Sequence, residues 1–269
     1  MIDLAVRQRW LPPVRDAVLA AGDAIMEIYE AGAEVRHKGD ASPVTDADEA
    51  GEKILLATLT TLEPRLPIVA EEAMAAGDGP DRVGNSFWLV DPLDGTKEFI
   101  QRRGEFTVNV GLVVDRIPVM GVVFAPAKGR LFWGDAEAGA FVADVTDGEL
   151  GAACAIAVRS APEGGLLAVA SKSHRTPETD DFLSRLPVAD SRSAGSSLKF
   201  CLVAEGQADI YPRFGPTMEW DTAAGDAILR AAGGAVLNPD GTPFRYGKPD
   251  FRNGNFIARG DSSLDRFIR

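Results

Sequence analysis

Cysteine and histidine are scarce in this chain, with two of each among 269 residues. Cys154 and Cys201 both stand among apolar neighbours, so we expect two buried, reduced thiols rather than a disulfide framework. The two cysteines and two histidines are scattered and lack the close pairing of a structural zinc site. The sequence therefore argues against a disulfide scaffold and against zinc.

Positive charge is also in short supply, because 28 Lys and Arg oppose 40 Asp and Glu, a formal net charge of −12. Such a chain repels nucleic acids and anionic membrane surfaces, although a local group of cations can still bind a small phosphate. No apolar run is long enough to span a membrane, and the first residues do not resemble a signal peptide. We expect a cytoplasmic protein with a small-molecule partner and no nucleic acid.

The composition is that of a soluble globular protein, with 45% hydrophobic and 25% charged residues. The 28 glycines and 17 prolines are typical of a loop-rich enzyme. A chain of this length suits one large domain or two lobes that share a core. The polar segment 144–153 predicts a boundary between an α+β lobe with an antiparallel sheet, residues 1–150, and an α/β lobe, residues 151–269.

Apolar periodicity predicts helices that alternate with strands. The expected helices are residues 12–31, 47–62, 177–186, 196–204 and 222–232. The expected strands are residues 66–70, 87–90, 106–114, 119–124, 131–133, 140–142, 166–170, 208–211 and 235–237. Asp46 is a candidate N-cap of the second helix, with Glu49 in the capping-box position. This alternation predicts a layered α/β fold.

The segment Asp91-Pro92-Leu93-Asp94-Gly95-Thr96 is the strongest candidate for a functional site. It follows an apolar strand, and Pro92 biases Asp91 toward an extended backbone. Its Asp-Gly-Thr turn offers backbone N–H groups to an anion such as phosphate.

Glu71 and Asp221 also follow apolar runs, and ligands bind at the carboxyl ends of strands in open α/β sheets. Two carboxylates about 4 Å apart repel by roughly 4 kcal/mol at an effective dielectric near 20, which a divalent cation relieves. Oxygen ligands favour Mg²⁺, Mn²⁺ or Ca²⁺ over zinc. Taken separately, each acid is better explained as a solvated or capping residue than as a metal ligand.

In order and spacing, three segments resemble the signature of the inositol monophosphatase superfamily. They are Glu71-Glu72, the segment from Asp91 to Thr96, and Trp220-Asp221-Thr222-Ala223-Ala224-Gly225. The resemblance extends over residues 15–260. It implies a lithium-sensitive, Mg²⁺-dependent phosphatase with an αβαβα sandwich of alternating helix layers and sheets.

Within that superfamily the chain is similar to the CysQ-type 3′(2′),5′-bisphosphate nucleotidases. The similarity rests on Lys97-Glu98 after the Asp-Gly-Thr turn and on the segments 195–201 and 211–217. It implies hydrolysis of the 3′-phosphate of adenosine 3′,5′-bisphosphate to AMP and phosphate. Activity on the sulfated analogue, a role in sulfur metabolism, a homodimer and peripheral association with the inner membrane remain open.

The resemblance also implies roles for individual residues. Two or three Mg²⁺ ions, or Mn²⁺ in their place, would be held by Glu71, Asp91, Asp94, Asp221 and the carbonyl of Leu93. Thr96 would help to activate the attacking water, with Asp46 accepting the hydrogen bond of its hydroxyl. Substrate contacts would come from Glu71, Asp94, Gly95, Thr96, Lys97, Ser171, His174, Gly195, Lys199, Arg213 and Asp221.

Two alternative functions remain at this point. The first is an inositol-1-monophosphatase, although Arg213 stands where inositol-cleaving relatives tend to place an acid. An arginine fork suits a second phosphate better than it suits a sugar hydroxyl. The second is a non-catalytic nucleotide sensor, which is disfavoured because none of the expected metal ligands is replaced.

Overall fold

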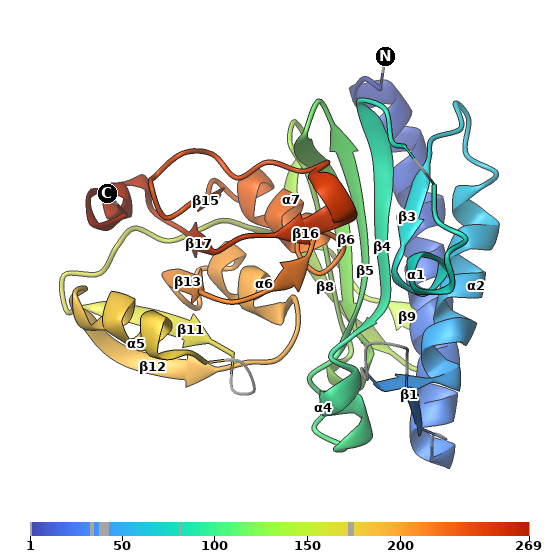
Figure 1. Cartoon of the computed structure of the whole chain (residues 1–269), viewed down its shortest axis with the longest axis horizontal. Coiled ribbons are helices and arrows are strands. Elements are labelled where there is room, and N and C mark those ends of the chain that lie inside the picture. The colour runs from blue at the N-terminus through green and yellow to red at the C-terminus, as the bar shows by residue number, and fades with distance from the viewer. Residues whose placement is uncertain (1, 33–34, 38–42, 81, 172–174, 269) are drawn as a thin grey trace.

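The computed structural model describes residues 2–32, 35–37, 43–80, 82–171 and 175–268. Five layers of alternating helices and sheets follow one another across the molecule (Figure 1). From one side of the molecule to the other, these layers are a helix pair, the first sheet, a central helix pair, the second sheet and an outer helix. The helices are α1 (Leu4–Ala31) and α2 (Asp46–Leu59), then α6 (Leu198–Ala204) and α7 (Ala223–Ala231), then α5 (Pro177–Ser184). The expected αβαβα sandwich is confirmed.

The first sheet has the order β10-β8-β7-β6-β5-β4-β3, and β9 pairs with β8. Its pairings are antiparallel except for β3 with β4, which is parallel. The strands are β3 (Ile68–Ala70), β4 (Ser86–Asp94), β5 (Thr107–Val114), β6 (Ile117–Ala125), β7 (Arg130–Asp135), β8 (Gly139–Thr146), β9 (Glu149–Leu150) and β10 (Cys154–Ile156). Two short helices, α3 (Glu71–Ala76) and α4 (Thr96–Ile100), follow β3 and β4.

The second sheet has the order β12-β11-β13-β17-β15 and mixes parallel and antiparallel pairs. Its strands are β11 (Leu166–Ala170), β12 (Val188–Ser193), β13 (Ile210–Arg213), β15 (Ala235–Leu237) and β17 (Phe256–Arg259). Two further strand pairs lie apart from both sheets. They join β1 (Val35–His37) to β2 (Pro43–Thr45) and β14 (Thr217–Met218) to β16 (Arg252–Asn253).

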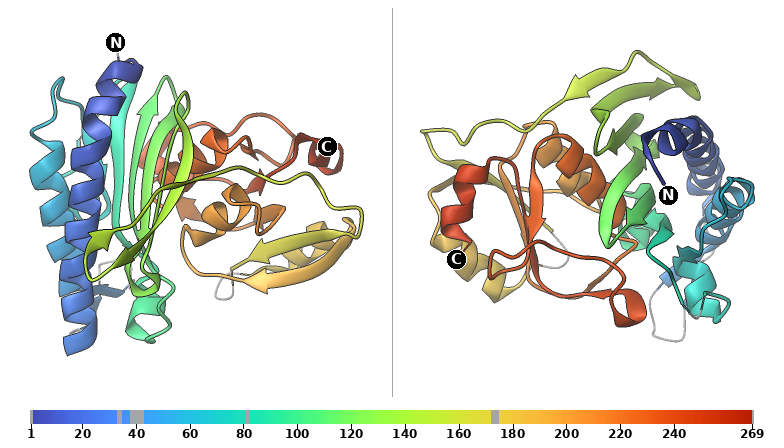
Figure 2. Two further views of the ribbon diagram at one scale, coloured as in Figure 1. Left: turned by 180° about the vertical axis from the view of Figure 1, so that it is seen from behind. Right: turned by 90° about the horizontal axis from the view of Figure 1, so that it is seen from above.

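Both faces of the first sheet are buried. One face packs under α1 and α2, where Trp10 contacts Trp88 with ring centroids 5.5 Å apart. The other face packs against α6 and α7 (Figure 2). Glycines let α7 approach closely, since a Cβ at Gly121 would lie 2.3 Å from the carbonyl oxygen of Ala224. This close contact brings the amino end of α7 against the middle of the first sheet.

The first helix starts earlier than the sequence analysis predicted. It begins at Leu4, and the side chain of Asp3 caps it by accepting a hydrogen bond from the Val6 N–H at 3.0 Å. Pro12 and Pro13 therefore lie inside the helix, where each lacks a backbone donor, rather than in its first turn. Tertiary packing of the added turns outweighs this loss, because Arg7 is buried and pairs with Asp135 at 2.6 Å.

Two other local predictions are also wrong. Thr45, not Asp46, is the N-cap of α2, and its capping-box partner is Asp48. Cys154 is exposed, because it lies on β10 at the edge of the first sheet, whereas Cys201 is buried as expected. The polar segment 144–153 forms the β8–β9 hairpin, and β10 then returns to pair with β8. In the part of the chain that the structure describes, no helix is long and apolar enough to cross a membrane.

Candidate active site

Acidic side chains from three elements meet at one end of the first sheet. Glu71 is the first residue of α3, directly after β3, Asp91 lies in β4, and Asp221 precedes α7. One carboxylate oxygen from each of these three residues lies within 4.8 Å of the others. The convergence that the sequence alone could not demonstrate is therefore present.

A bulge in β4 adds Asp94 to this group. Asp91 pairs with Asn109 and Asp94 with Thr107, so β4 has one more residue than β5 between these two pairs. Side chains three positions apart on a regular strand point to opposite faces, and the extra residue re-aims them. The Leu93 N–H donates to Asp91 Oδ1 at 3.0 Å and supports the bent backbone.

The acids shift one another's protonation. Burial, and then the charges of Glu71 and Asp94, raise the pKa of Asp91 well above its ordinary value. Burial, and then the charges of Asp94 and Glu71, raise the pKa of Asp221 in the same way. Burial also raises the pKa of Asp94 to about 6, against the opposing effect of the Lys199 ammonium. Clustered carboxylates that resist ionisation are the donor set that fits a hard divalent cation.

The hydroxyl of Thr96 lies beside Asp48 rather than beside the predicted Asp46. Thr96 Oγ1 is 3.2 Å from Asp48 Oδ1 and 3.3 Å from the Leu93 carbonyl oxygen. Asp48 Oδ2 accepts from Thr45 N–H at 2.7 Å, which fixes the carboxylate. Asp46 instead pairs with Arg36 at 2.6 Å, and its side chain is 60% exposed. The residues Thr45 to Asp48 match a capping-box pattern that would have identified the correct acid.

A small cavity continues from the acids into the second half of the chain. Its volume is about 110 Å³, and it is lined by Asp94, Ser171, Ser196, Lys199, Phe200, Tyr211, Arg213, Thr217, Asp221 and Thr222. The structure thus brings five of the predicted substrate-binding residues to one cavity: Asp94, Ser171, Lys199, Arg213 and Asp221. A larger groove, of about 760 Å³, lies between α2 and α3 and is lined by a separate set of residues.

The two cations of the cavity are buried. Lys199 is 4% exposed, and its ammonium donates to the carbonyl oxygen of Ser196 at 2.6 Å. Burial lowers the pKa of Lys199 to about 8. Arg213 is 8% exposed and donates from Nη2 to the Pro216 carbonyl at 3.0 Å. Its Nε is buried and makes no hydrogen bond within the described part of the chain.

The remaining predicted substrate contacts are placed differently. Lys97 is exposed on α4 and does not line the cavity. Gly95 and Gly195 allow the segments around residues 95, 105 and 195 to pack closely. A Cβ at Gly95 would lie 2.4 Å from Ser196 Oγ, and a Cβ at Gly195 would lie 2.4 Å from the Glu105 carbonyl oxygen. His174 lies outside the described residues.

Comparison with known proteins identifies the family of this chain. The profile of the inositol monophosphatase family matches residues 7–267. The chain belongs to the inositol monophosphatase family. It is 47% identical to the 3′(2′),5′-bisphosphate nucleotidase CysQ of Salmonella typhimurium over 228 residues, which cover 84% of this chain and 89% of that protein.

Solved structures of this family have the same fold. CysQ from Bacteroides thetaiotaomicron, a bacterial member of the inositol monophosphatase family, matches with a TM-score of 0.78 and 39% identity over 96% of this chain and 99% of that one. An inositol monophosphatase from Anabaena matches with a TM-score of 0.75 and 28% identity, over 97% and 94% of the two chains. The resemblance stated from the sequence motifs is confirmed.

In this member of the family, other polar residues that the sequence analysis did not single out support the acids. Ser197 Oγ lies 3.2 Å from Asp94 Oδ2 and 2.8 Å from the Asp221 carbonyl oxygen, and so links the two halves of the site. The amide of Asn253 donates to the Met218 carbonyl at 2.7 Å and holds the segment that leads to Asp221. No sequence motif marks Asn253, because its contacts are made across a long separation along the chain.

Proposed function

We propose that this protein is a Mg²⁺-dependent 3′(2′),5′-bisphosphate nucleotidase that converts adenosine 3′,5′-bisphosphate into AMP and phosphate. The observation that carries the proposal is the single cavity in which Asp94 and Asp221 lie with two buried cations, Lys199 and Arg213. The names of the relatives described above support the same activity. The sulfated analogue of this nucleotide is a second substrate of the proposal, which would serve sulfur assimilation and nucleotide recycling.

The acidic cluster fits Mg²⁺ by its chemistry, since its side-chain donors are carboxylate oxygens gathered within reach of one ion. Two or three ions, with Mn²⁺ as a substitute, would be held by Glu71, Asp91, Leu93 through its carbonyl, Asp94 and Asp221. When bound, Mg²⁺ lowers the pKa of water and offsets the negative charge that builds up as phosphate is transferred.

Thr96 and Asp48 are the proposed pair that prepares the attacking water. Asp48 is fixed by Thr45 and accepts the hydrogen bond of the Thr96 hydroxyl. The Thr96 oxygen can then accept a hydrogen bond from water. This hydrogen bond orients a lone pair of the water oxygen toward phosphorus. As the water attacks phosphorus, its proton would pass to Thr96 Oγ1 while the Thr96 hydroxyl proton passes to Asp48, and proton transfer of this kind typically contributes a factor of about 10²–10⁴.

Lys199 and Arg213 are the proposed partners of the phosphate that is not cleaved. Arg213 carries a buried Nε without a partner in the described part of the chain, and guanidinium forks bind phosphate oxygens in pairs. The cavity volume of about 110 Å³ is well below the roughly 300–1,000 Å³ that encloses a whole ligand. We therefore infer that the cavity takes the phosphates and that the nucleoside extends beyond it. Further substrate contacts would come from Ser171, Gly195 and His174. Gly95 and Lys97 would lie near the phosphate that is cleaved.

Measurement of phosphate release tests this function. We expect wild-type protein with Mg²⁺ to hydrolyse adenosine 3′,5′-bisphosphate faster than inositol 1-phosphate or fructose 1,6-bisphosphate, and excess chelator to abolish the reaction. Asp94→Asn should keep the fold and lose most activity, because it removes a charge from the acidic cluster. A preference for inositol 1-phosphate would contradict the proposed substrate, and release of phosphate in chelator would contradict the metal. No release from any of the three substrates would favour a non-catalytic sensor.

A further inference from the structure

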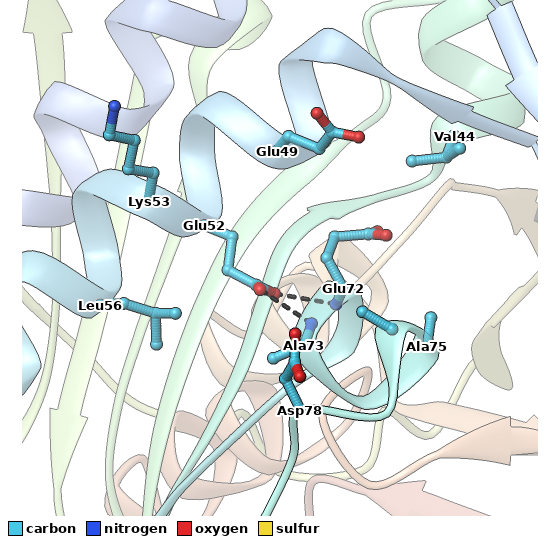
Figure 3. A pocket seen from close by; sticks show the side chains of 10 residues that line it. Val44, Glu49, Glu52, Lys53, Leu56, Glu72, Ala73, Ala75 and Asp78 are labelled. Carbon is cyan, nitrogen blue, oxygen red and sulfur yellow. Dashed lines mark hydrogen bonds between the residues drawn. The ribbon is translucent and has the colours of Figure 1, made fainter.

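Glu52 makes a contact that joins two helices beside the site. It lies on α2 and lines the groove of about 760 Å³ between α2 and α3, where its side chain points toward the start of α3 (Figure 3). Its carboxylate accepts hydrogen bonds from the backbone N–H groups of Glu72, at 2.8 Å, and Ala73, at 2.9 Å. Glu52 is 6% exposed, so this buried charge is stabilised by backbone donors from the neighbouring helix.

These donors are the groups that a helix normally satisfies with its own N-cap. The N-cap position of α3 is Ala70, which makes no side-chain hydrogen bond. An N-cap side chain usually accepts from the second or third N–H of its helix, and Glu72 and Ala73 occupy those two positions. Glu52 therefore supplies from α2 the cap that Ala70 cannot provide.

Glu71 lies directly before the two residues that this cap holds. Glu71 stands between Ala70 and Glu72, and its carboxylate is part of the cluster with Asp91 and Asp221. Carboxylates about 4 Å apart repel by roughly 4 kcal/mol at an effective dielectric near 20. That repulsion would turn the amino end of α3 away from β4 unless its backbone were held. Glu52 holds the backbone directly after Glu71.

The same helix supports the other half of the site. Asp48, one turn before Glu52 on α2, contacts Thr96. Residues four apart on a helix lie on the same face, so this face of α2 contacts the first turns of α3 and α4, where Glu71 and Thr96 lie. Because α2 is packed against α1 and β4, it provides a fixed reference for Glu71 and Thr96 together.

We propose that Glu52 is a positioning residue that keeps Glu71 at cation-binding distance from Asp91 and Asp221. The inference rests on the proposed function for the role of Glu71 as a cation ligand. It assigns a role to a residue that is itself outside the acidic cluster. Removing a residue that orients a metal ligand typically costs about 10- to 100-fold in metal affinity.

Titration calorimetry with Mn²⁺ tests this proposal without relying on turnover. We expect Glu52→Gln and Glu52→Ala to bind Mn²⁺ about 10- to 100-fold more weakly than wild type, with Glu52→Gln the less affected because it keeps one acceptor oxygen. The Mg²⁺ concentration that gives half-maximal activity should rise by the same factor, while kcat at saturating Mg²⁺ should change little. A purely structural role would lower the melting temperature without this selective rise.

Glu49→Gln is the matched control. It removes the same charge from the same helix, but Glu49 is 57% exposed and pairs with Arg36 at 3.0 Å. Wild-type Mn²⁺ affinity in Glu52→Gln, or an equal loss in Glu49→Gln, would overturn the proposal. If Glu52→Ala does not fold, Glu52→Gln decides. If the wild type binds Mn²⁺ and Glu52→Gln does not, yet no nucleotide is hydrolysed, the proposed function fails while the positioning role stands.

Discussion

At the scale of single residues, the contacts that an acid makes, rather than its residue type, decide its role in this site. Asp46 and Asp48 differ by two positions, yet one pairs with Arg36 at the surface and the other contacts Thr96. The sequence located an acid at the start of α2 but not the correct one. The difference arises because the N3 residue of a capping box points back over the helix start, whereas the first helical residue here points outward.

This difference gives a direct comparison of two variants. Asp48→Asn should lower kcat by about 10²- to 10⁴-fold, since the Thr96 hydroxyl loses the carboxylate that orients it. Asp46→Asn should leave kcat near the wild-type value. Steady-state kinetics at saturating Mg²⁺ measures both, and melting curves check that loss of the Asp48 cap, which costs about 1 kcal/mol, has not unfolded the protein. Equal kcat values for the two variants would remove Asp48 from the mechanism.

Some residues of the site could be predicted from the sequence and others could not. The metal-ligand candidates Glu71, Asp91 and Asp221 could be predicted because each follows an apolar run in the sequence. The runs before Glu71 and Asp91 form strands β3 and β4, whereas the run before Asp221 ends in a turn that leads into α7. Glu52 and Asn253 could not, because each binds backbone that is distant in sequence and no local pattern records the pairing.

At the scale of elements, strongly apolar strands were the most predictable. The strands at 166–170 and 235–237 match their predicted bounds to the residue. β12 was missed because its sequence, Val-Ala-Asp-Ser-Arg-Ser, lacks apolar alternation and it is held by parallel pairing with β11. β17 was missed because it is short and its central place between β13 and β15 is decided by tertiary pairing.

The packing of α7 on the first sheet also depends on tertiary structure. Gly111 on β5 and Gly121 on β6 leave room for the backbone of Ala223 and Ala224. This close approach places Asp221, just before α7, next to Asp91 on β4. The sequence contains these glycines, but only the folded sheet shows that they face one helix.

At the scale of the whole molecule, the acidic cluster makes stability depend on pH and on cations. The pKa of Asp94 is raised to about 6, and those of Asp91 and Asp221 are raised well above the ordinary value. The folded protein therefore binds more protons than the unfolded chain above about pH 4, and each such group destabilises the fold as pH rises through its folded pKa. In chelator, this cluster should make the protein less stable near pH 7 than near pH 5.

Added Mg²⁺ should reverse that loss. At about 100 times its dissociation constant a ligand stabilises the folded state by about 2.7 kcal/mol, which corresponds to a rise of roughly 5–10 °C in melting temperature for a protein of this size. The rise should be larger near pH 7.5 than near pH 5.5, because protons compete with the cation. Asp94→Asn should weaken both the pH dependence and the Mg²⁺ response. A Mg²⁺ response independent of pH would contradict the coupling.

The central claim is that the cavity selects a nucleotide with two phosphates. Its most direct test compares kcat/KM for adenosine 3′,5′-bisphosphate and for adenosine 3′-phosphate, in the wild type and in Arg213→Ala. A charge-assisted contact to the second phosphate contributes about 1.5–3 kcal/mol. The wild type should therefore prefer the bisphosphate, and Arg213→Ala should reduce that preference by about 10- to 150-fold, with Arg213→Lys in between. Equal losses on both substrates, or a wild type without the preference, would contradict the account.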